Sequence, residues 1–514
     1  MFDLIIAGGT VVDGTRDARP RRTDLGVKDG TIAAVDDLGE ARSATRIDAT
    51  GKVVAPGFID VHVHSEAQLL GKQDDLYASS LQGVTTHLTA PDGFGWGGLS
   101  ADLARSMWDQ TVSIYGVPDS FEVGWRSPEA YRTALAGDLP VNVVLQVPHH
   151  AVRATAMGFD RRHAQDPERR AMTGSVEAWL QAGAVSLALG LDYIPGGFSD
   201  EGELVHLAQI LADAGGSLQS HARFTELGRD GAWEEMLRVG RATGIRVNIS
   251  HATLDDELVD LIEPWLDQVD LALDTYLYPA GCTHLLYLIP TVHQVETASF
   301  LASLTNPDGR AAALAHFEHA FATGSDPTRM TIGASRSGRH DGTTIAEVAD
   351  ASGRNAAEAA LSLVEEEEAD VLIVYGQAIS DEAFAANVAA TLAFPNAMIA
   401  SDGIYRGQRP HPRGFGCFPR VLREYVRERG LVSLADAIHR MSGLPAERYG
   451  LDDRGRLELG RVADVVVFDP ATVGDRATWE EPRLPPVGID HVIVNGHEVI
   501  REASPTGTLP GRVR

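Results

Sequence analysis

Cysteine, lysine and long apolar segments are all scarce in this sequence of 514 residues. The two cysteines, Cys282 and Cys417, are too few for a disulfide framework and are typical of a reduced cytoplasm. No apolar run approaches the ~20 residues that a membrane-spanning helix needs. The first nine residues also lack the basic region of a signal peptide. We therefore expect a cytoplasmic protein without a membrane partner.

Basic residues are scarce as well. The chain has 44 lysines and arginines against 72 acidic residues, which gives a formal net charge of −28. A protein that binds nucleic acid needs a basic footprint for the phosphates, so we expect no nucleic-acid partner. Hydrophobic residues make up 44% of the chain, enough for a large globular core.

The middle of the chain alternates between apolar strand-like segments and helical patterns. The expected strands lie at 58–64, 83–90, 141–148, 184–190, 217–222, 246–252, 269–276 and 396–402. Eight strand–helix units predict an α/β fold, a (β/α)8 TIM-like barrel with its active site at the carboxyl ends of the strands. The connections 91–140 and 277–395 are too long for simple loops, and the second predicts a lid-like insertion.

Both ends of the chain read as short strands joined by tight turns, with Asp29-Gly30 near the start and Asn495-Gly496 near the end. The simplest arrangement pairs the two ends in one small β-sandwich domain, because chain termini often lie close together. We therefore predict a β-sandwich domain of residues 1–55 plus 455–514 and a barrel domain of residues 56–454.

Histidines and aspartates recur at the ends of the expected barrel strands. His62 and His64 are two apart and so share one face of a strand. Chance alone predicts roughly 0.6 such pairs, so the pair by itself is weak. His221 and His251 end two later strands, and Asp402 ends the eighth. These ends meet at one mouth of a barrel, which predicts a metal site.

Three longer motifs carry a resemblance to a known family. They are the run 56–64, the run 190–196 (Gly-Leu-Asp-Tyr-Ile-Pro-Gly) and the run 411–420 (His-Pro-Arg-Gly-Phe-Gly-Cys-Phe-Pro-Arg). With them the chain resembles the amidohydrolase superfamily and, within it, the D-aminoacylase branch of N-acyl-D-amino-acid deacylases. The resemblance implies a metal-dependent enzyme that hydrolyses the amide bond of an N-acyl-D-amino acid or a related N-acylated small molecule. One or two divalent ions are implied, with Zn²⁺ the expected one.

The resemblance also implies site residues. Asp402 is the general base and then the general acid, although an Asp-Gly pair could also cap a helix. The implied metal ligands are His62, His64, Asp92, His221, His251 and Asp402. The implied substrate contacts are His150, Tyr193, Arg223, Tyr276, Tyr278 and Cys282.

The sequence departs from this family at several positions. No lysine follows Lys72, so the carboxylated lysine that bridges two metals in many amidohydrolases is excluded. Asp92 stands where the D-aminoacylase branch has a cysteine, and is either a metal ligand or a turn residue before Gly93. Thr253 and Cys282 replace a lysine and a serine that hold the substrate carboxylate in the family. The arginines that could replace the lost cation are Arg153, Arg223, Arg406 and Arg409, each of which could equally be a surface residue.

These departures leave other functions open. The enzyme could hydrolyse a neutral or cyclic amide, or the chain could be a non-catalytic oligomeric scaffold. Self-association into a homo-oligomer is compatible with either reading.

Overall fold

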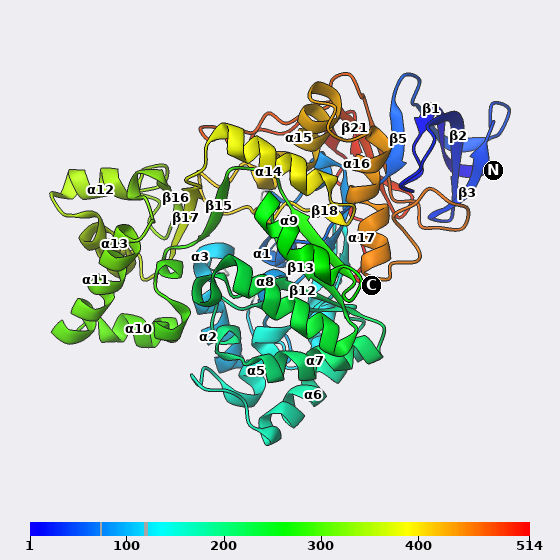
Figure 1. Cartoon of the computed structure of the whole chain (residues 1–514). Coiled ribbons are helices and arrows are strands. Elements are labelled where there is room, and N and C mark those ends of the chain that lie inside the picture. The colour runs from blue at the N-terminus through cyan, green and yellow to red at the C-terminus, as the bar shows by residue number, and fades with distance from the viewer. Residues whose placement is uncertain (72–74, 118–121) are drawn as a thin grey trace.

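A ring of parallel strands forms the centre of the fold (Figure 1). The computed structural model describes residues 1–71, 75–117 and 122–514. Two parallel sheets run in the orders β6-β8-β9 and β10-β11-β12-β13-β14-β18, and β7 pairs with β19 to join the last strand position to the first. The predicted (β/α)8 barrel is confirmed. Its strands are β6 (Phe58–Asp60) and β7 (Val63–His64), β8 (Val84–Leu88), β9 (Asn142–Val144) and β10 (Val147–Pro148), β11 (Ser186–Gly190), β12 (Ser217–His221), β13 (Arg246–Ile249), β14 (Leu271–Thr275), and β18 (Ala397–Ile399) and β19 (Gly403–Ile404).

Burial explains why these segments form strands. Every residue of β11, β12 and β14 is buried, as expected for parallel strands covered on both faces. The helices between them begin and end at ordinary signals: Asp200 accepts a hydrogen bond from the Glu203 amide at the start of α7, and Gly244 takes a left-handed conformation after α8. The helices that follow strands β10 to β13 along the chain are α5 (His149–Met157), α6 (Asp166–Gln181), α7 (Glu201–Asp213), α8 (Phe224–Thr243) and α9 (Asp256–Ile262).

The two ends of the chain share one sheet of nine strands. Its junction is the antiparallel pair β5–β20, in which Val53 faces Phe468 and Pro56 faces Val465. The predicted pairing of the two ends is therefore present, while the division of the chain at residues 55 and 455 stays a prediction. The strands are β1 (Phe2–Val11), β2 (Arg21–Lys28), β3 (Thr31–Asp36), β4 (Ser43–Asp48), β5 (Val53–Pro56), β20 (Val465–Phe468), β21 (Ile489–Val494), β22 (His497–Arg501) and β23 (Ser504–Pro505).

The long connection after β14 contains a sheet of its own, which lies at the left of Figure 1. We call residues 280–376 the insertion. Its antiparallel sheet has the order β15-β17-β16, and its helices pack on that sheet around a separate apolar core. Helix α14 (Asp381–Ala393) then returns the chain to the barrel. The elements of the insertion are β15 (Ala280–His284), η5 (Leu285–Leu288), η6 (Thr291–His293), α10 (Thr297–Ser303), α11 (Pro307–Ala322), η7 (Pro327–Arg329), β16 (Met330–Ser335), α12 (Ile345–Ser352), α13 (Ala356–Glu366) and β17 (Val371–Gly376).

The remaining helices are short segments that connect these elements. Within the described residues, none of the helices is long and apolar enough to cross a membrane. These elements are α1 (Glu66–Gly71), η1 (Ser80–Gln82), η2 (Pro91–Gly93), α2 (Ala101–Gln110), α3 (Val112–Tyr115), α4 (Pro128–Leu135), η3 (Gly196–Phe198), η4 (Glu263–Trp265), α15 (Arg413–Arg420), η8 (Val421–Glu428), α16 (Leu434–Met441) and α17 (Gly443–Arg448).

Candidate metal centre

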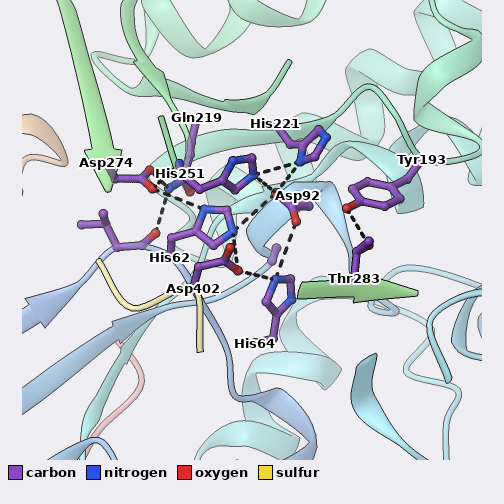
Figure 2. A network of polar contacts seen from close by, with 12 residues as sticks. His62, His64, Asp92, Tyr193, Gln219, His221, His251, Asp274, Thr283 and Asp402 are labelled. Atoms are coloured by element: carbon purple, nitrogen blue, oxygen red, sulfur yellow. Dashed lines mark hydrogen bonds and ion pairs between the residues drawn. The ribbon is translucent and has the colours of Figure 1, made fainter. Parts of the chain in front are cut away.

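Six side chains converge at the carboxyl ends of the barrel strands (Figure 2). Each comes from the end of a strand or from the turn that follows it, which is where parallel strands of a barrel bring side chains together. The structure thus brings together the whole set of ligands implied by the sequence. They are His62, His64, Asp92, His221, His251 and Asp402.

Asp92 lies between two pairs of histidines. Its Oδ1 is 3.6 Å from Nε2 of His251 and 3.8 Å from Nδ1 of His221. Its Oδ2 is 3.6 Å from Nε2 of His64, and Oδ1 is 3.4 Å from Nε2 of His62. One carboxylate therefore faces both pairs, the arrangement of a bridging ligand.

The spacing of these atoms suits a small divalent cation. Two ligand atoms each ~2.0–2.1 Å from one zinc ion in tetrahedral geometry lie about 3.3 Å apart. Nδ1 of His221 and Nε2 of His251 are 2.9 Å apart, and Oδ1 of Asp402 is 3.2 Å from Nε2 of His64. Three groups of three residues have ligand atoms within 4.8 Å of one another: His62, His64 and Asp92; His62, His251 and Asp402; Asp92, His221 and His251.

The hydrogen bonding of the cluster is incomplete in a way that a cation would satisfy. Both ring nitrogens of His62 and Oδ1 of Asp92 are buried without a hydrogen-bond partner. Burial alone would lower the pKa of His62, but the carboxylates of Asp92, Asp402 and Asp274 outweigh it and raise that pKa to about 10. A positive charge at this position is strongly stabilised, so the donor set fits a metal ion.

Two of the candidate histidine ligands also contact a polar side chain through the ring nitrogen that faces away from the cluster. Nε2 of His221 lies 3.1 Å from Oδ2 of Asp192, and Nδ1 of His64 lies 3.0 Å from the hydroxyl of Tyr115. Metal-binding histidines are commonly oriented in this way through the nitrogen that faces away from the metal. The sequence analysis assigned no role to Asp192 or Tyr115, since neither ends a strand.

The backbone is strained at half of the ligand positions. Asp92, His251 and Asp402 have φ values of 54°, 41° and 46°, which only a few per cent of non-glycine residues adopt. The loop of Asp92 also lies hard against β11: a Cβ at Gly190 would come within 2.0 Å of the Asp92 carbonyl oxygen. Glycine is required at that position of the 190–196 motif.

A small cavity lies next to the cluster. Three of the expected substrate contacts line it, namely Tyr193, Tyr276 and Cys282. The insertion supplies part of its wall, and the empty space, including the part open to solvent, is about 350 Å³. The other lining residues outside the ligand set are Ile114, Thr283, Tyr375, Ile404 and Arg413.

The other three expected substrate contacts do not line this cavity. Nε2 of His150 lies 2.9 Å from the Gly190 carbonyl oxygen, so that histidine supports the β11 end. Tyr278 packs against the Arg420 guanidinium, 4.4 Å from its ring centre. Arg223 donates to the carbonyls of the 197–199 turn and faces Glu235, because its backbone begins α8 and directs the buried side chain toward that turn.

Arg413 is the functional candidate that the sequence analysis missed. It is buried, its Nη2 lies 2.8 Å from Oδ2 of Asp402, and its guanidinium carbon lies 4.3 Å from the centre of the Tyr276 ring. Its Nε and Nη1 have no hydrogen-bond partner. The 411–420 motif was the available signal, but Arg413 lies in α15, beyond the end of the last barrel strand, and site residues were expected mainly at strand ends.

The arginines suggested by the sequence are engaged elsewhere. Arg153 pairs with Glu203, Arg406 pairs with Asp370, and Arg409 donates to the Glu480 carbonyl. Among the described residues that line the cavity, Arg413 is therefore the one permanent cation.

The similarity to known proteins extends along nearly the whole chain. The Amidohydrolase family profile matches residues 45–500. A D-aminoacylase of Alcaligenes xylosoxydans xylosoxydans is 35% identical over 520 residues, covering 100% of this chain and 97% of the relative. An N-acyl-D-glutamate deacylase of the same organism is 34% identical over 523 residues, covering 100% of this chain and 96% of the relative.

Solved structures give the same result. An N-acyl-D-glutamate deacylase from Bordetella bronchiseptica, complexed with zinc and a phosphonate inhibitor, superposes with a TM-score of 0.83 at 33% identity, covering 100% of this chain and 99% of that one. A D-hydantoinase with 17% identity and a TM-score of 0.56 covers 100% of this chain and 98% of that one, and shares the fold.

Proposed function

The chain belongs to the amidohydrolase family, and on that premise we propose that it removes the acyl group from an N-acyl-D-amino acid or a related N-acylated small molecule with the help of a divalent metal ion. The observation that carries this proposal is the cluster of four histidines and two aspartates at the barrel mouth, which form three overlapping groups of three residues with ligand atoms within 4.8 Å of one another in each group. Zinc is the expected ion, because tetrahedral nitrogen and oxygen ligands suit it and because a similar deacylase was solved with zinc.

The ligands divide into two overlapping sets. His221, His251 and Asp92 form one. The other consists of His62 and His64 with Asp402, and Asp92 faces both. We propose that Asp92 takes the place of the cysteine found in the D-aminoacylase branch. A carboxylate is a harder ligand than a thiolate, so this centre should accept oxygen-preferring ions such as Mn²⁺ more readily than a thiolate centre does.

Asp402 is proposed as the proton carrier. A bound zinc ion would acidify water to a pKa of about 7 and polarise the scissile carbonyl. Burial alone would raise the pKa of Asp402, but Arg413 and His62 outweigh it and lower that pKa, so the side chain is a carboxylate at neutral pH. It can then accept a proton from water and return it to the leaving nitrogen.

Arg413 is proposed to hold the carboxylate of the substrate. A guanidinium binds a carboxylate through two parallel hydrogen bonds, from Nη2 together with either Nε or Nη1, and Nε, Nη1 and Nη2 of Arg413 are all buried without a hydrogen-bond partner. Arg413 of α15 thus supplies the cation that is missing at Thr253, where the family has a lysine. This arrangement favours a substrate with a free carboxylate over a neutral or cyclic amide.

A substrate screen tests the proposal. Zinc-loaded protein is incubated with N-acetyl-D-methionine, N-acetyl-L-methionine and the matching carboxamides, and the free amine is measured. We expect hydrolysis of the D-acid above the others. Turnover of the carboxamide alone would refute the deacylase assignment, and no turnover by protein that binds no stoichiometric metal would refute an enzymatic role.

We also propose that the enzyme works in the cytoplasm on its small-molecule substrate. The two cysteines are buried and unpaired, as expected in a reducing compartment. The surplus of 28 acidic residues disfavours a nucleic-acid partner. Assembly into a homo-oligomer stays a prediction.

A further inference from the structure

Two hydroxyl groups of the insertion reach Asp192, the residue behind His221: one its carboxylate and the other its backbone carbonyl. The Tyr287 hydroxyl in η5 donates to Oδ2 of Asp192 at 3.1 Å. The Thr291 hydroxyl in η6 donates to the backbone carbonyl of Asp192 at 2.9 Å. Asp192 belongs to the loop after β11 and lies about a hundred residues away in the chain, so these contacts tie the insertion to the barrel.

Asp192 is held from several directions. Oδ2 accepts from Nε2 of His221 at 3.1 Å as well as from Tyr287. Oδ1 accepts from the amide and the hydroxyl of Thr225, at 3.0 and 2.6 Å. The side chain is fully buried. A buried carboxylate with four donors has one stable orientation, and that orientation fixes the ring of His221.

The ring of His221 must be fixed because its Nδ1 faces the metal cluster. Nδ1 lies 2.9 Å from Nε2 of His251 and 3.8 Å from Oδ1 of Asp92. For Nδ1 to present a lone pair, the proton of the neutral ring must stay on Nε2, and the acceptor on that side is Asp192. The acceptor behind a metal-binding histidine sets both its tautomer and its orientation.

The same part of the insertion presses closely on the barrel. A Cβ at Gly197 would lie 2.3 Å from Cγ2 of Thr291, so η6 rests directly on η3. The insertion also forms part of the cavity wall through Cys282, Thr283 and Tyr375. A movement of the insertion that opens the cavity would therefore also withdraw both hydroxyls from Asp192.

We propose that Tyr287 and Thr291 are positioning residues for the metal ligand His221 and act through Asp192, so that contact of the insertion with the barrel completes the metal centre. The inference rests on the proposed function, because it takes His221 to be a metal ligand. It adds that the affinity for the metal depends on side chains of the insertion that touch neither metal nor substrate.

The first test is the zinc affinity of Tyr287→Phe and Thr291→Val, measured by competition with a chromophoric chelator. Loss of an outer hydrogen bond to a metal ligand weakens binding roughly 10- to 100-fold, and we expect about tenfold for each variant. Matched controls are Tyr425→Phe, whose buried hydroxyl donates to the Leu277 carbonyl, and Thr305→Val, whose hydroxyl donates to the Ala302 carbonyl within the insertion. Both controls should bind zinc as the parent does. Unchanged affinity of the two test variants would overturn the proposal.

A double variant tests the route through Asp192. When Asp192→Asn is already present, adding Tyr287→Phe should weaken zinc binding by less than about twofold, because Tyr287 can then no longer act through the Asp192 carboxylate. Independent, multiplying effects would mean that Tyr287 acts by another path. If Asp192→Asn does not fold, the visible absorption of cobalt-loaded Tyr287→Phe decides: an altered spectrum supports the proposal and the parent spectrum overturns it. A parent protein that binds no metal would instead refute the proposed function itself.

Discussion

Replacing Arg413 by methionine should separate substrates by their charge. The side chain is buried, its Nη2 lies 2.8 Å from Oδ2 of Asp402, and its Nε, Nη1 and Nη2 have no hydrogen-bond partner, so an edge of the guanidinium can bind a carboxylate. Methionine keeps much of the volume and the contact with the Tyr276 ring, but removes the cation. We therefore expect a large loss of activity on an N-acyl-D-amino acid and a much smaller loss on its carboxamide.

The magnitude follows from the two hydrogen bonds that one edge of the guanidinium can donate to a carboxylate. Hydrogen bonds to charged groups are worth ~1.5–3 kcal/mol each, so two of them contribute about 3–6 kcal/mol to binding the carboxylate. At ~1.4 kcal/mol for each factor of ten, kcat/KM for the acid should fall roughly 10²- to 10⁴-fold. A carboxamide has no carboxylate to accept these bonds. Its kcat/KM should therefore change only because Asp402 has lost the guanidinium beside it.

The assay compares kcat/KM for both substrates in the parent, in Arg413→Met and in Arg413→Lys, with zinc content and circular dichroism recorded for each. Lysine keeps the charge beside Asp402 but loses the planar fork, so it should recover the carboxamide rate more fully than the acid rate. An equal fall on acid and carboxamide in Arg413→Met would show that Arg413 serves Asp402 alone, and the carboxylate assignment would be withdrawn.

Three further outcomes are expected. Asp402→Asn should retain most of its zinc while turnover falls by orders of magnitude, and near-parent turnover would contradict its role as proton carrier. Asp92→Ala should lower zinc stoichiometry more than Asp92→Cys does, because Asp92 faces both ligand sets; metal analysis after gel filtration checks this. Asp464→Ala should destabilise the junction of barrel and sheet by ~1–3 kcal/mol, since Nη1 of the buried Arg454 loses its partner 3.1 Å away while Asp453 still holds Nη2; a urea midpoint like that of the parent would contradict this.

The barrel and the convergence of the candidate ligands at its mouth were predictable because two periodic signals coincide. Buried parallel strands read as continuous apolar runs, and their carboxyl ends meet at one mouth. His221 and His251 therefore pointed to the same place as His62 although they lie far apart in the chain. Asp92 was recognisable only by comparison with a family cysteine, since it lies in a turn beyond β8 and not on a strand.

Strand boundaries were less predictable. The expected strand 58–64 is divided into β6 and β7. Next to the break, the Asp60 carboxylate accepts hydrogen bonds from the amide and hydroxyl of Ser401, taking the place of a backbone carbonyl between the first and last strands. A side chain that replaces a backbone carbonyl in the hydrogen bonding between two strands leaves no periodic pattern in the sequence.

Side chains that act across long separations were missed for a related reason. Arg413 reaches Asp402 from a helix, and Tyr287 reaches Asp192 from a 3-10 turn of the insertion. The residues next to them in the sequence indicate the local secondary structure, but not which distant side chains they contact. Arg223 shows the converse error: it was one of the arginines expected to replace the missing cation, but the strand ends at His221 and the chain turns into α8.

Backbone strain connects the motif residues to the metal centre. Asp92, His251 and Asp402 all adopt left-handed conformations, each of which costs ~1–3 kcal/mol unless its surroundings enforce it. The enforcing contacts are specific: the His251 amide donates to Asp274 at 2.8 Å and the Asp402 amide donates to the His62 carbonyl at 2.8 Å. Asp92 is pressed against Gly190, where no Cβ fits. The ligands are thus aimed by backbone that the barrel holds in place before any metal binds, which reduces the reorganisation that binding requires.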